Sequence, residues 1–188
     1  IALGIQSVGA ALVPINTRYK PGEAAYPLQK TKAKMLFTAD GFMGIEGEAV
    51  VAKIRQEGGP DIRIININGD EAKEDSLSSF LSSAQSNDGD HRARNFKDIS
   101  ASTLCDIMFT SGSTGKPKGV RHLHGPTVRQ TFNTIEENNL TDTDRMLVIN
   151  PFFHVFGYTG GWVPALFSGA TVYPLPVFDV DQVLALIQ

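Results

Sequence analysis

Apolar residues along the chain follow two periodicities, one typical of helices and one typical of strands. Helical spacing occurs in residues 1–9, 23–30, 45–57, 126–138, 156–166 and 180–187. Short apolar runs of strand length occur in residues 10–15, 35–38, 62–67, 103–109, 146–150 and 170–173. Because the predicted strands alternate with predicted helices, we predict an α/β fold built mostly from parallel βαβ layers.

Glycine and proline mark where several of these elements begin or end. Pro21 and Gly22 precede the predicted helix 23–30, and the run 58–60 (Gly-Gly-Pro) ends the predicted helix 45–57. Pro27 lies inside the first of these helices, where its ring cannot donate a backbone hydrogen bond. We therefore expect this helix either to start late or to kink at Pro27.

One long segment, residues 69–102, differs in composition from the rest of the chain. From Gly69 to Arg94 it is rich in serine and acidic residues, and the few large apolar side chains of that stretch are Leu77, Phe80 and Leu81. We predict an exposed connector that contains a short helix. The alternative is a lid that covers a binding site.

Composition limits the class of protein. The chain has 188 residues, 41% of them hydrophobic and 20% charged, which is enough for a globular core. Its net charge of −3, with no basic stripe, argues against a nucleic-acid partner. Its longest apolar runs are too short to cross a bilayer, so we predict no membrane span. The single cysteine, Cys105, cannot form an internal disulfide, which favours a reducing, cytoplasmic location, and we expect it to be a buried thiol rather than a nucleophile.

The most informative stretch is the loop 110–119, which reads Thr-Ser-Gly-Ser-Thr-Gly-Lys-Pro-Lys-Gly and follows the predicted strand 103–109. Glycine allows the backbone to turn tightly and to approach a ligand closely. The hydroxyls and backbone N–H groups donate hydrogen bonds, and the two lysines carry positive charge. We interpret this stretch as a loop that binds the phosphates of a nucleotide.

Two other interpretations of the loop are less consistent with its residues. A Walker A loop needs a lysine followed by serine or threonine, whereas Lys116 is followed by Pro117. A flexible Ser/Gly linker would share the composition but has no need of two lysines and a proline directly after an apolar strand.

A second block, residues 150–158, reads Asn-Pro-Phe-Phe-His-Val-Phe-Gly-Tyr and places one histidine among aromatic residues after a predicted strand. By itself, His154 fits a structural histidine as well as a functional one. Phe153, Phe156, Gly157 and Trp162 fit either the wall of a ligand pocket or ordinary core packing.

Together the two blocks resemble the adenylate-forming (AMP-binding) superfamily, in particular its acyl-CoA synthetase branch. The loop is similar to the signature of that superfamily, and the spacing Pro151-x-x-His154-x-x-Gly157 is similar to its histidine block. The run around His122 and His124 also parallels the family, but Gly125 and Pro126 follow, so we assign no adenylate-facing role to His124.

The resemblance implies a role for each of these residues. The ATP phosphates would be bound by Thr110, Ser111, Gly112, Ser113, Thr114, Gly115, Lys116, Lys118 and Gly119. The acyl-adenylate pocket would include His154, Phe153, Phe156 and Gly157. ATP, Mg²⁺ and CoA are the implied co-substrates and cofactor, with a carboxylic acid as substrate. Mg²⁺ would bridge phosphate oxygens, and we name no metal-ligating residue of the chain.

The resemblance also implies that residues 1–188 are a partial N-terminal AMP-binding domain, truncated at both ends. The family's later Tyr-Gly-x-Thr-Glu block, its ribose-binding aspartate and its C-terminal catalytic lysine have no match here. The expected parent is an ATP-dependent carboxylate–CoA ligase, closer to bacterial fatty-acyl or ring-acid ligases than to luciferases, and hence an enzyme of fatty acid metabolism. The alternatives are a free-standing, non-catalytic phosphate-binding module and the adenylation domain of a peptide synthetase.

We predict that the chain 1–188, by itself, binds ATP weakly and turns over nothing, because the adenine, ribose and catalytic-lysine sites are expected elsewhere. The measurement is ATP–pyrophosphate exchange, with Lys118→Ala as the control. Exchange by the wild-type chain above the Lys118→Ala level would contradict the prediction.

Overall fold

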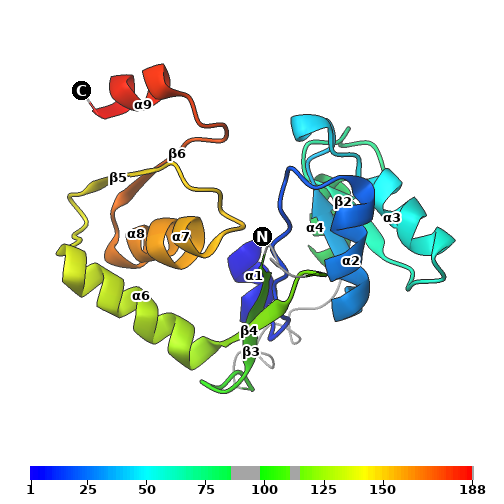
Figure 1. Ribbon diagram of the computed structural model, residues 1–188, viewed down its shortest axis with the longest axis horizontal. Helices are drawn as coiled ribbons and strands as arrows, with labels where there is room; N and C mark the ends of the chain where they lie inside the picture. The colour runs from blue at the N-terminus through cyan, green and yellow to red at the C-terminus, as the bar shows by residue number, and fades with distance from the viewer. Residues whose placement is uncertain (86–97, 111–114, 188) are drawn as a thin grey trace. The chain divides into compact units, whose positions relative to one another are not determined.

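A computed structural model describes residues 1–85, 98–110 and 115–187 (Figure 1). Its described residues form two compact units. The first draws on Ile1–Pro14, Asp98–Thr110 and Val120–Gln188, and the second on Ile15–Lys97 and Ser111–Gly119. Each unit is described separately below. No helix in the described ranges combines the length and the apolar character that a membrane span requires.

The second unit contains one parallel βαβ arrangement. Strand β1 (Met35–Thr38) pairs in parallel with β2 (Arg63–Asn66), from Met35 opposite Arg63 to Thr38 opposite Asn66. The chain between the two strands forms the short 3-10 turn η1 (Phe42–Gly44) and helix α3 (Gly47–Gln56). Helix α2 (Pro21–Thr31) precedes β1, and helix α4 (Leu77–Gln85) follows β2 within the segment that the sequence predicted to be a connector with a short helix.

Helix α2 starts earlier than the sequence indicated. Pro21 occupies its first turn, where a missing N–H costs nothing, and Glu23 accepts the backbone N–H of Lys20 at 2.8 Å. Pro27 is buried inside the helix, which continues to Thr31. Thr31 lies one turn after Pro27, and its hydroxyl donates to the carbonyl oxygen of Pro27 at 2.8 Å.

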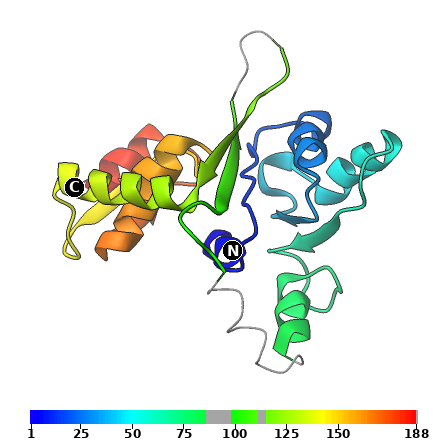
Figure 2. The same ribbon diagram turned by 90° about the horizontal axis from the view of Figure 1, so that it is seen from below.

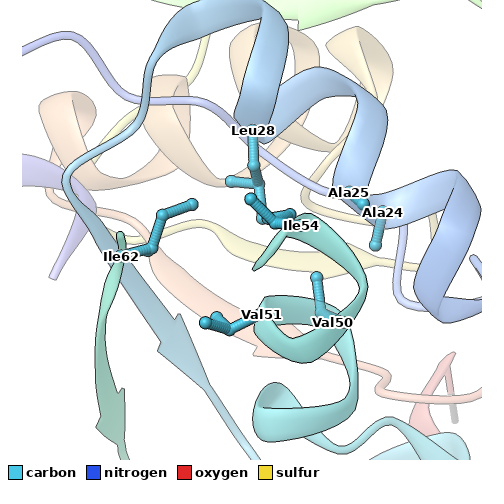
Figure 3. Packing of buried hydrophobic residues seen from close by; sticks show 7 residues of the cluster. All are labelled: Ala24, Ala25, Leu28, Val50, Val51, Ile54 and Ile62. Carbon is cyan, nitrogen blue, oxygen red and sulfur yellow. The ribbon is translucent and has the colours of Figure 1, made fainter. Parts of the chain in front are cut away.

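The core of the second unit lies where α2 and α3 pack together (Figure 3). Both helices contribute their apolar face, and a residue just before β2 completes the cluster. Its buried members are Ala24, Ala25, Leu28, Val50, Val51, Ile54 and Ile62. Apolar burial of this kind is the main favourable term in the stability of the unit.

A half-buried polar network joins the ends of β1 and β2 to the start of α3. One carboxylate oxygen of Asp40 accepts hydrogen bonds from the Thr38 hydroxyl at 2.8 Å and the Gly47 backbone N–H at 2.9 Å. Its other oxygen accepts from the Asn66 amide at 3.0 Å. Asp40 therefore places a negative charge at the N-terminus of α3, where the helix dipole favours it.

The first unit contains a second parallel βαβ arrangement. Strand β5 (Arg145–Val148) pairs in parallel with β6 (Thr171–Pro174). Between them lie α7 (Val155–Gly157), the π-helical turn η3 (Tyr158–Trp162) and α8 (Val163–Ser168). The remaining elements are α1 (Ala2–Ser7), β3 (Leu104–Phe109), β4 (Gly119–Leu123), α6 (His124–Asn138) and α9 (Val180–Ile187). Helix α6, yellow-green in Figure 2, packs against orange α8.

The α/β class with parallel strands is confirmed, but the structure differs from the sequence prediction in three places. Residues 10–15 form a single bridge, between Leu12 and Asp106, rather than a strand. The predicted helix 156–166 is interrupted by η3, which contains two glycines. Strand β4, which directly follows the loop, was not predicted, because its polar residues break the alternation of apolar positions.

We predict that Ile54→Ala lowers the free energy of unfolding by about 2–5 kcal/mol, because it leaves a cavity in a fully buried position. Urea unfolding followed by far-UV circular dichroism measures the loss. The matched control is Ile67→Ala, since Ile67 is 43% exposed and its truncation should cost less than about 1 kcal/mol. Equal losses for the two variants would contradict this description of the core.

Candidate nucleotide and acyl site

Strand β3 carries the start of the predicted phosphate loop and has two hydrogen-bonding neighbours. It pairs with β4 on one edge. Leu12 bridges to it in parallel: the Leu12 N–H donates to the Cys105 carbonyl at 3.0 Å, and the Ile107 N–H donates to the Leu12 carbonyl at 2.8 Å. Cys105, Asp106 and Met108 are buried. The loop therefore leaves a strand whose backbone is held firmly in place.

The described residues of the loop itself are exposed. Thr110, Gly115, Lys116 and Lys118 all lie at the surface, whereas Ser111–Thr114 fall outside the described residues. Gly115 has φ +155°, a backbone conformation that favours glycine, and a β-carbon built on it would meet nothing within 4 Å. An open backbone next to two exposed cations suits the approach of an anionic ligand.

The two lysines have different surroundings. The ammonium of Lys116 lies 5.5 Å from the centre of the Tyr26 ring on helix α2, a distance typical of a cation–π contact. The nearby Glu57 carboxyl has a pKa below its usual value, mainly through its hydrogen bond with Lys53, and Lys116 adds to this lowering. Lys118 forms no ion pair with another residue in the described part of the chain.

His154 stands at the start of α7 and is exposed. Its Nδ1 accepts the backbone N–H of Phe156 at 3.3 Å, and its ring stacks on the Phe156 ring with centroids 5.7 Å apart. Because Nδ1 acts as an acceptor, the neutral imidazole carries its proton on Nε2 and offers a hydrogen-bond donor to a ligand. Phe156 is 68% exposed, so this stacked pair forms an accessible aromatic surface.

The other aromatic candidates divide between surface and core. Trp162 packs against the buried cluster of Met108, Tyr158 and Val163, with its ring 5.3 Å from that of Tyr158. Gly157 is buried, and a β-carbon on it would clash with the backbone of Pro151. These contacts give Trp162 and Gly157 a packing role. Phe153 lies between surface and core, because it is half-buried.

Comparison with known proteins identifies the family of the chain. The chain matches the family described as AMP-binding enzyme over residues 1–188. The chain belongs to the AMP-binding enzyme family.

Two relatives within the AMP-binding family are named as CoA ligases. It is 39% identical over 191 residues to 3-[(3aS,4S,7aS)-7a-methyl-1,5-dioxo-octahydro-1H-inden-4-yl]propanoyl:CoA ligase from Rhodococcus jostii (strain RHA1), covering 98% of this chain and 36% of the relative. It is 34% identical over 186 residues to the ligase of the same name from Mycobacterium tuberculosis (strain ATCC 25618 / H37Rv), covering 99% of this chain and 36% of the relative. The chain thus spans just over a third of the length of these relatives.

Solved structures of the family share the fold. The inhibitor-bound N-terminal domain of FACL13 from Mycobacterium tuberculosis superimposes with a TM-score of 0.74 at 26% identity, covering 99% of this chain and 43% of that domain. ATP-bound MatB from Rhodopseudomonas palustris gives a TM-score of 0.73 at 22% identity, covering 99% of this chain and 34% of MatB. The second comparison shows a common fold only.

Sequence reasoning missed a set of polar groups around strand β3 in the first unit of this AMP-binding chain. The Gln6 amide donates to the Tyr158 hydroxyl at 2.6 Å and to the Cys105 sulfur at 3.0 Å. Asp106 is fully buried, and its Oδ1 lies 2.6 Å from Nδ1 of His122. The only signal in the sequence was an aspartate within an otherwise apolar strand.

Burial changes the acidity of two members of this set. It raises the pKa of the Cys105 thiol to about 12, and the negative charge of Asp106 adds to the rise. Burial also raises the pKa of Tyr158 to about 12, although the hydrogen bond from Gln6 opposes the rise. Cys105 is thus a protonated, buried thiol, in agreement with the absence of a nucleophilic role.

We predict that the chain loses stability as the pH rises above about 9. The unfolded chain releases the Cys105 proton near its ordinary pKa of 9.0 and the Tyr158 proton near 10.0, whereas the folded chain keeps both until about pH 12. Each group therefore lowers the free energy of unfolding by at most about 1.4 kcal/mol per pH unit in that interval.

The measurement is urea unfolding at pH 8 to 11 for the wild-type chain, Cys105→Ala and Tyr158→Phe. Each variant loses a hydrogen-bond partner of Gln6, which shifts its stability at every pH, but only the removed titration changes the slope. Cys105→Ala should flatten the decline from pH 9 and Tyr158→Phe from pH 10. Slopes identical to that of the wild type would contradict the raised pKa values.

Proposed function

We propose that this chain is the part of an ATP-dependent carboxylate–CoA ligase that binds the ATP phosphates and supplies a portion of the acyl pocket. The observation that carries the proposal is an exposed loop with glycine and two lysines, directly after a buried strand that has two hydrogen-bonding neighbours. Membership of the AMP-binding family and the names of the relatives as CoA ligases support it.

The proposed reaction has two steps. An oxygen of the substrate carboxylate attacks the α-phosphorus of ATP, and the bond to pyrophosphate breaks, which gives an acyl-adenylate. The sulfur of CoA then attacks the acyl carbon, the thiol proton is released to solvent, and AMP leaves. Both steps bring an electron-rich atom toward an electron-poor centre that carries anionic neighbours, so alignment and charge compensation dominate catalysis.

The loop residues have complementary parts in the first step. Backbone N–H groups and hydroxyls of Thr110–Gly119, with Ser111, Gly112, Ser113 and Thr114 among them, hold the β- and γ-phosphates. Lys118, which is exposed and unpaired among the described residues, offsets the charge that develops on the departing pyrophosphate. Lys116 contributes positive charge nearby, from its position over Tyr26.

The acyl side of the site is assigned to the histidine block. The Nε2–H of His154 donates a hydrogen bond to the acyl-adenylate, and the stacked Phe156 ring contacts the acyl group. Phe153 and Gly157 shape the wall behind them. The two relatives named for a fused-ring propanoate favour a ring-bearing carboxylic acid as the substrate class.

Mg²⁺ is the proposed metal cofactor. The described residues contain no group of three or more His, Cys, Asp or Glu side chains that could hold a metal ion. We propose that Mg²⁺ would bind through oxygens of the nucleotide, which are the hard ligands that it prefers. We further propose a cytoplasmic enzyme of fatty acid or ring-acid metabolism.

We predict that Lys118→Ala, made in the complete enzyme that carries this chain, lowers the rate of ATP–pyrophosphate exchange about 100-fold. The reason is that a positioned charge-compensating group is lost from the first step. Lys34→Ala is the matched control, because Lys34 is an exposed lysine of the second unit, outside the loop, and its removal changes the net charge equally.

The same enzyme should release AMP when it is given ATP, CoA and the correct acid from a panel. The panel contains fused-ring propanoates, indoleacetate and fatty acids of several lengths. Failure to form AMP with any acid would exclude the ligase function, and equal exchange by Lys118→Ala and Lys34→Ala would exclude the role of Lys118.

A further inference from the structure

Asp106 and His122 form a contact between the two strands that enter and leave the loop. Asp106 lies on β3, four residues before Thr110, and His122 lies on β4, three residues after Gly119. Nδ1 of His122 is 2.6 Å from Oδ1 of Asp106. The contact therefore joins the two strands close to both ends of the loop.

The carboxylate of Asp106 depends on this contact. Asp106 is 0% exposed, and an ionised carboxylate in such a position is unfavourable unless it is paired. Its Oδ2 has no hydrogen-bond partner among the described residues. His122 forms an ion pair with Asp106 when protonated, or donates a hydrogen bond to it when neutral.

The backbone of Asp106 is anchored separately. Leu12 bridges to it in parallel, and the neighbouring Ile107 N–H donates to the Leu12 carbonyl. The Leu12 segment thus holds β3 but not β4, whereas the side-chain contact reinforces the pairing of β3 with β4. His122 is 31% exposed, so β4 contributes a side chain that reaches from the surface to a fully buried partner.

We propose that Asp106 and His122 are positioning residues for the ATP phosphate loop. The pair adds a side-chain contact between β3 and β4, the strands that enter and leave the loop. The proposal rests on the function proposed above. Among the described residues, neither Asp106 nor His122 has a hydrogen bond or ring contact with His154 or Phe156, so loss of the pair impairs ATP binding more than recognition of the acid.

The test compares three variants of the complete enzyme with the wild type. His122→Leu removes the donor to Asp106. His122→Asn keeps an amide N–H close to the position of Nδ1. Thr131→Ala removes a different buried hydrogen bond, from the Thr131 hydroxyl to the Thr127 carbonyl at 2.9 Å, and serves as a control for general destabilisation. Circular dichroism melting ranks the stability of all four proteins.

We expect His122→Leu to raise the KM for ATP at least about tenfold while the KM for the acid stays within about twofold, because small misplacement of binding groups has large effects on rate. His122→Asn should restore most of the ATP affinity. Thr131→Ala should melt at a lower temperature without any change in the KM for ATP.

A second measurement, the affinity for a non-hydrolysable ATP analogue without acid or CoA, separates this proposal from the proposed function. If the wild type binds the analogue and forms no AMP with any acid, the ligase function fails, and weaker analogue binding by His122→Leu still supports positioning. Wild-type affinity in His122→Leu, or equal losses in His122→Leu and Thr131→Ala, would overturn the inference. A wild type that does not bind the analogue would overturn both proposals.

Discussion

An anion-binding loop makes few contacts of its own, so its geometry depends on the strands that flank it. Here the entering strand, β3, is held by the Leu12 segment and by β4. Buried side chains of Cys105, Asp106 and Met108 fix it further within the first unit. Strand β3 therefore gives the proposed phosphate loop a fixed starting point. If the loop binds ATP as proposed, a less constrained strand would add to the entropy lost on binding.

The strong periodic segments of the fold could be predicted from the sequence, and the irregular ones could not. Strand β1 was predicted with its observed bounds, because an apolar run between turn residues leaves few alternatives. The bridge at Leu12 was predicted as a strand because a sequence shows apolar character but not which backbone groups find partners. The π-helical turn η3 depends on how Gly161 packs against Val148, a contact distant in the sequence.

In the candidate site, too, some features could be predicted from the sequence and others could not. The loop and the histidine block are local patterns, so a prediction of their chemistry could be made from neighbouring residues, and it stays a prediction. The contact of His154 with Phe156 followed from no pattern, although the hydrogen bond from the Phe156 N–H to Nδ1 determines which imidazole nitrogen is available. The pair of Asp106 and His122 joins positions sixteen residues apart, on either side of the loop. Only the pairing of β3 with β4, which the polar sequence of β4 concealed, brings them together.

The two lysines of the loop show why composition alone cannot assign roles. Both are exposed and both carry a full charge, yet Lys116 already has an aromatic partner in Tyr26, whereas Lys118 has no ion-pair partner among the described residues. A cation that leaves a partner to bind phosphate gains only the difference between the two interactions, and an exposed contact of this type is worth about 0.5–1 kcal/mol. Within the described ranges, Lys118 has no such contact to lose. If the loop binds a polyphosphate as proposed, Lys118 therefore has the larger net gain.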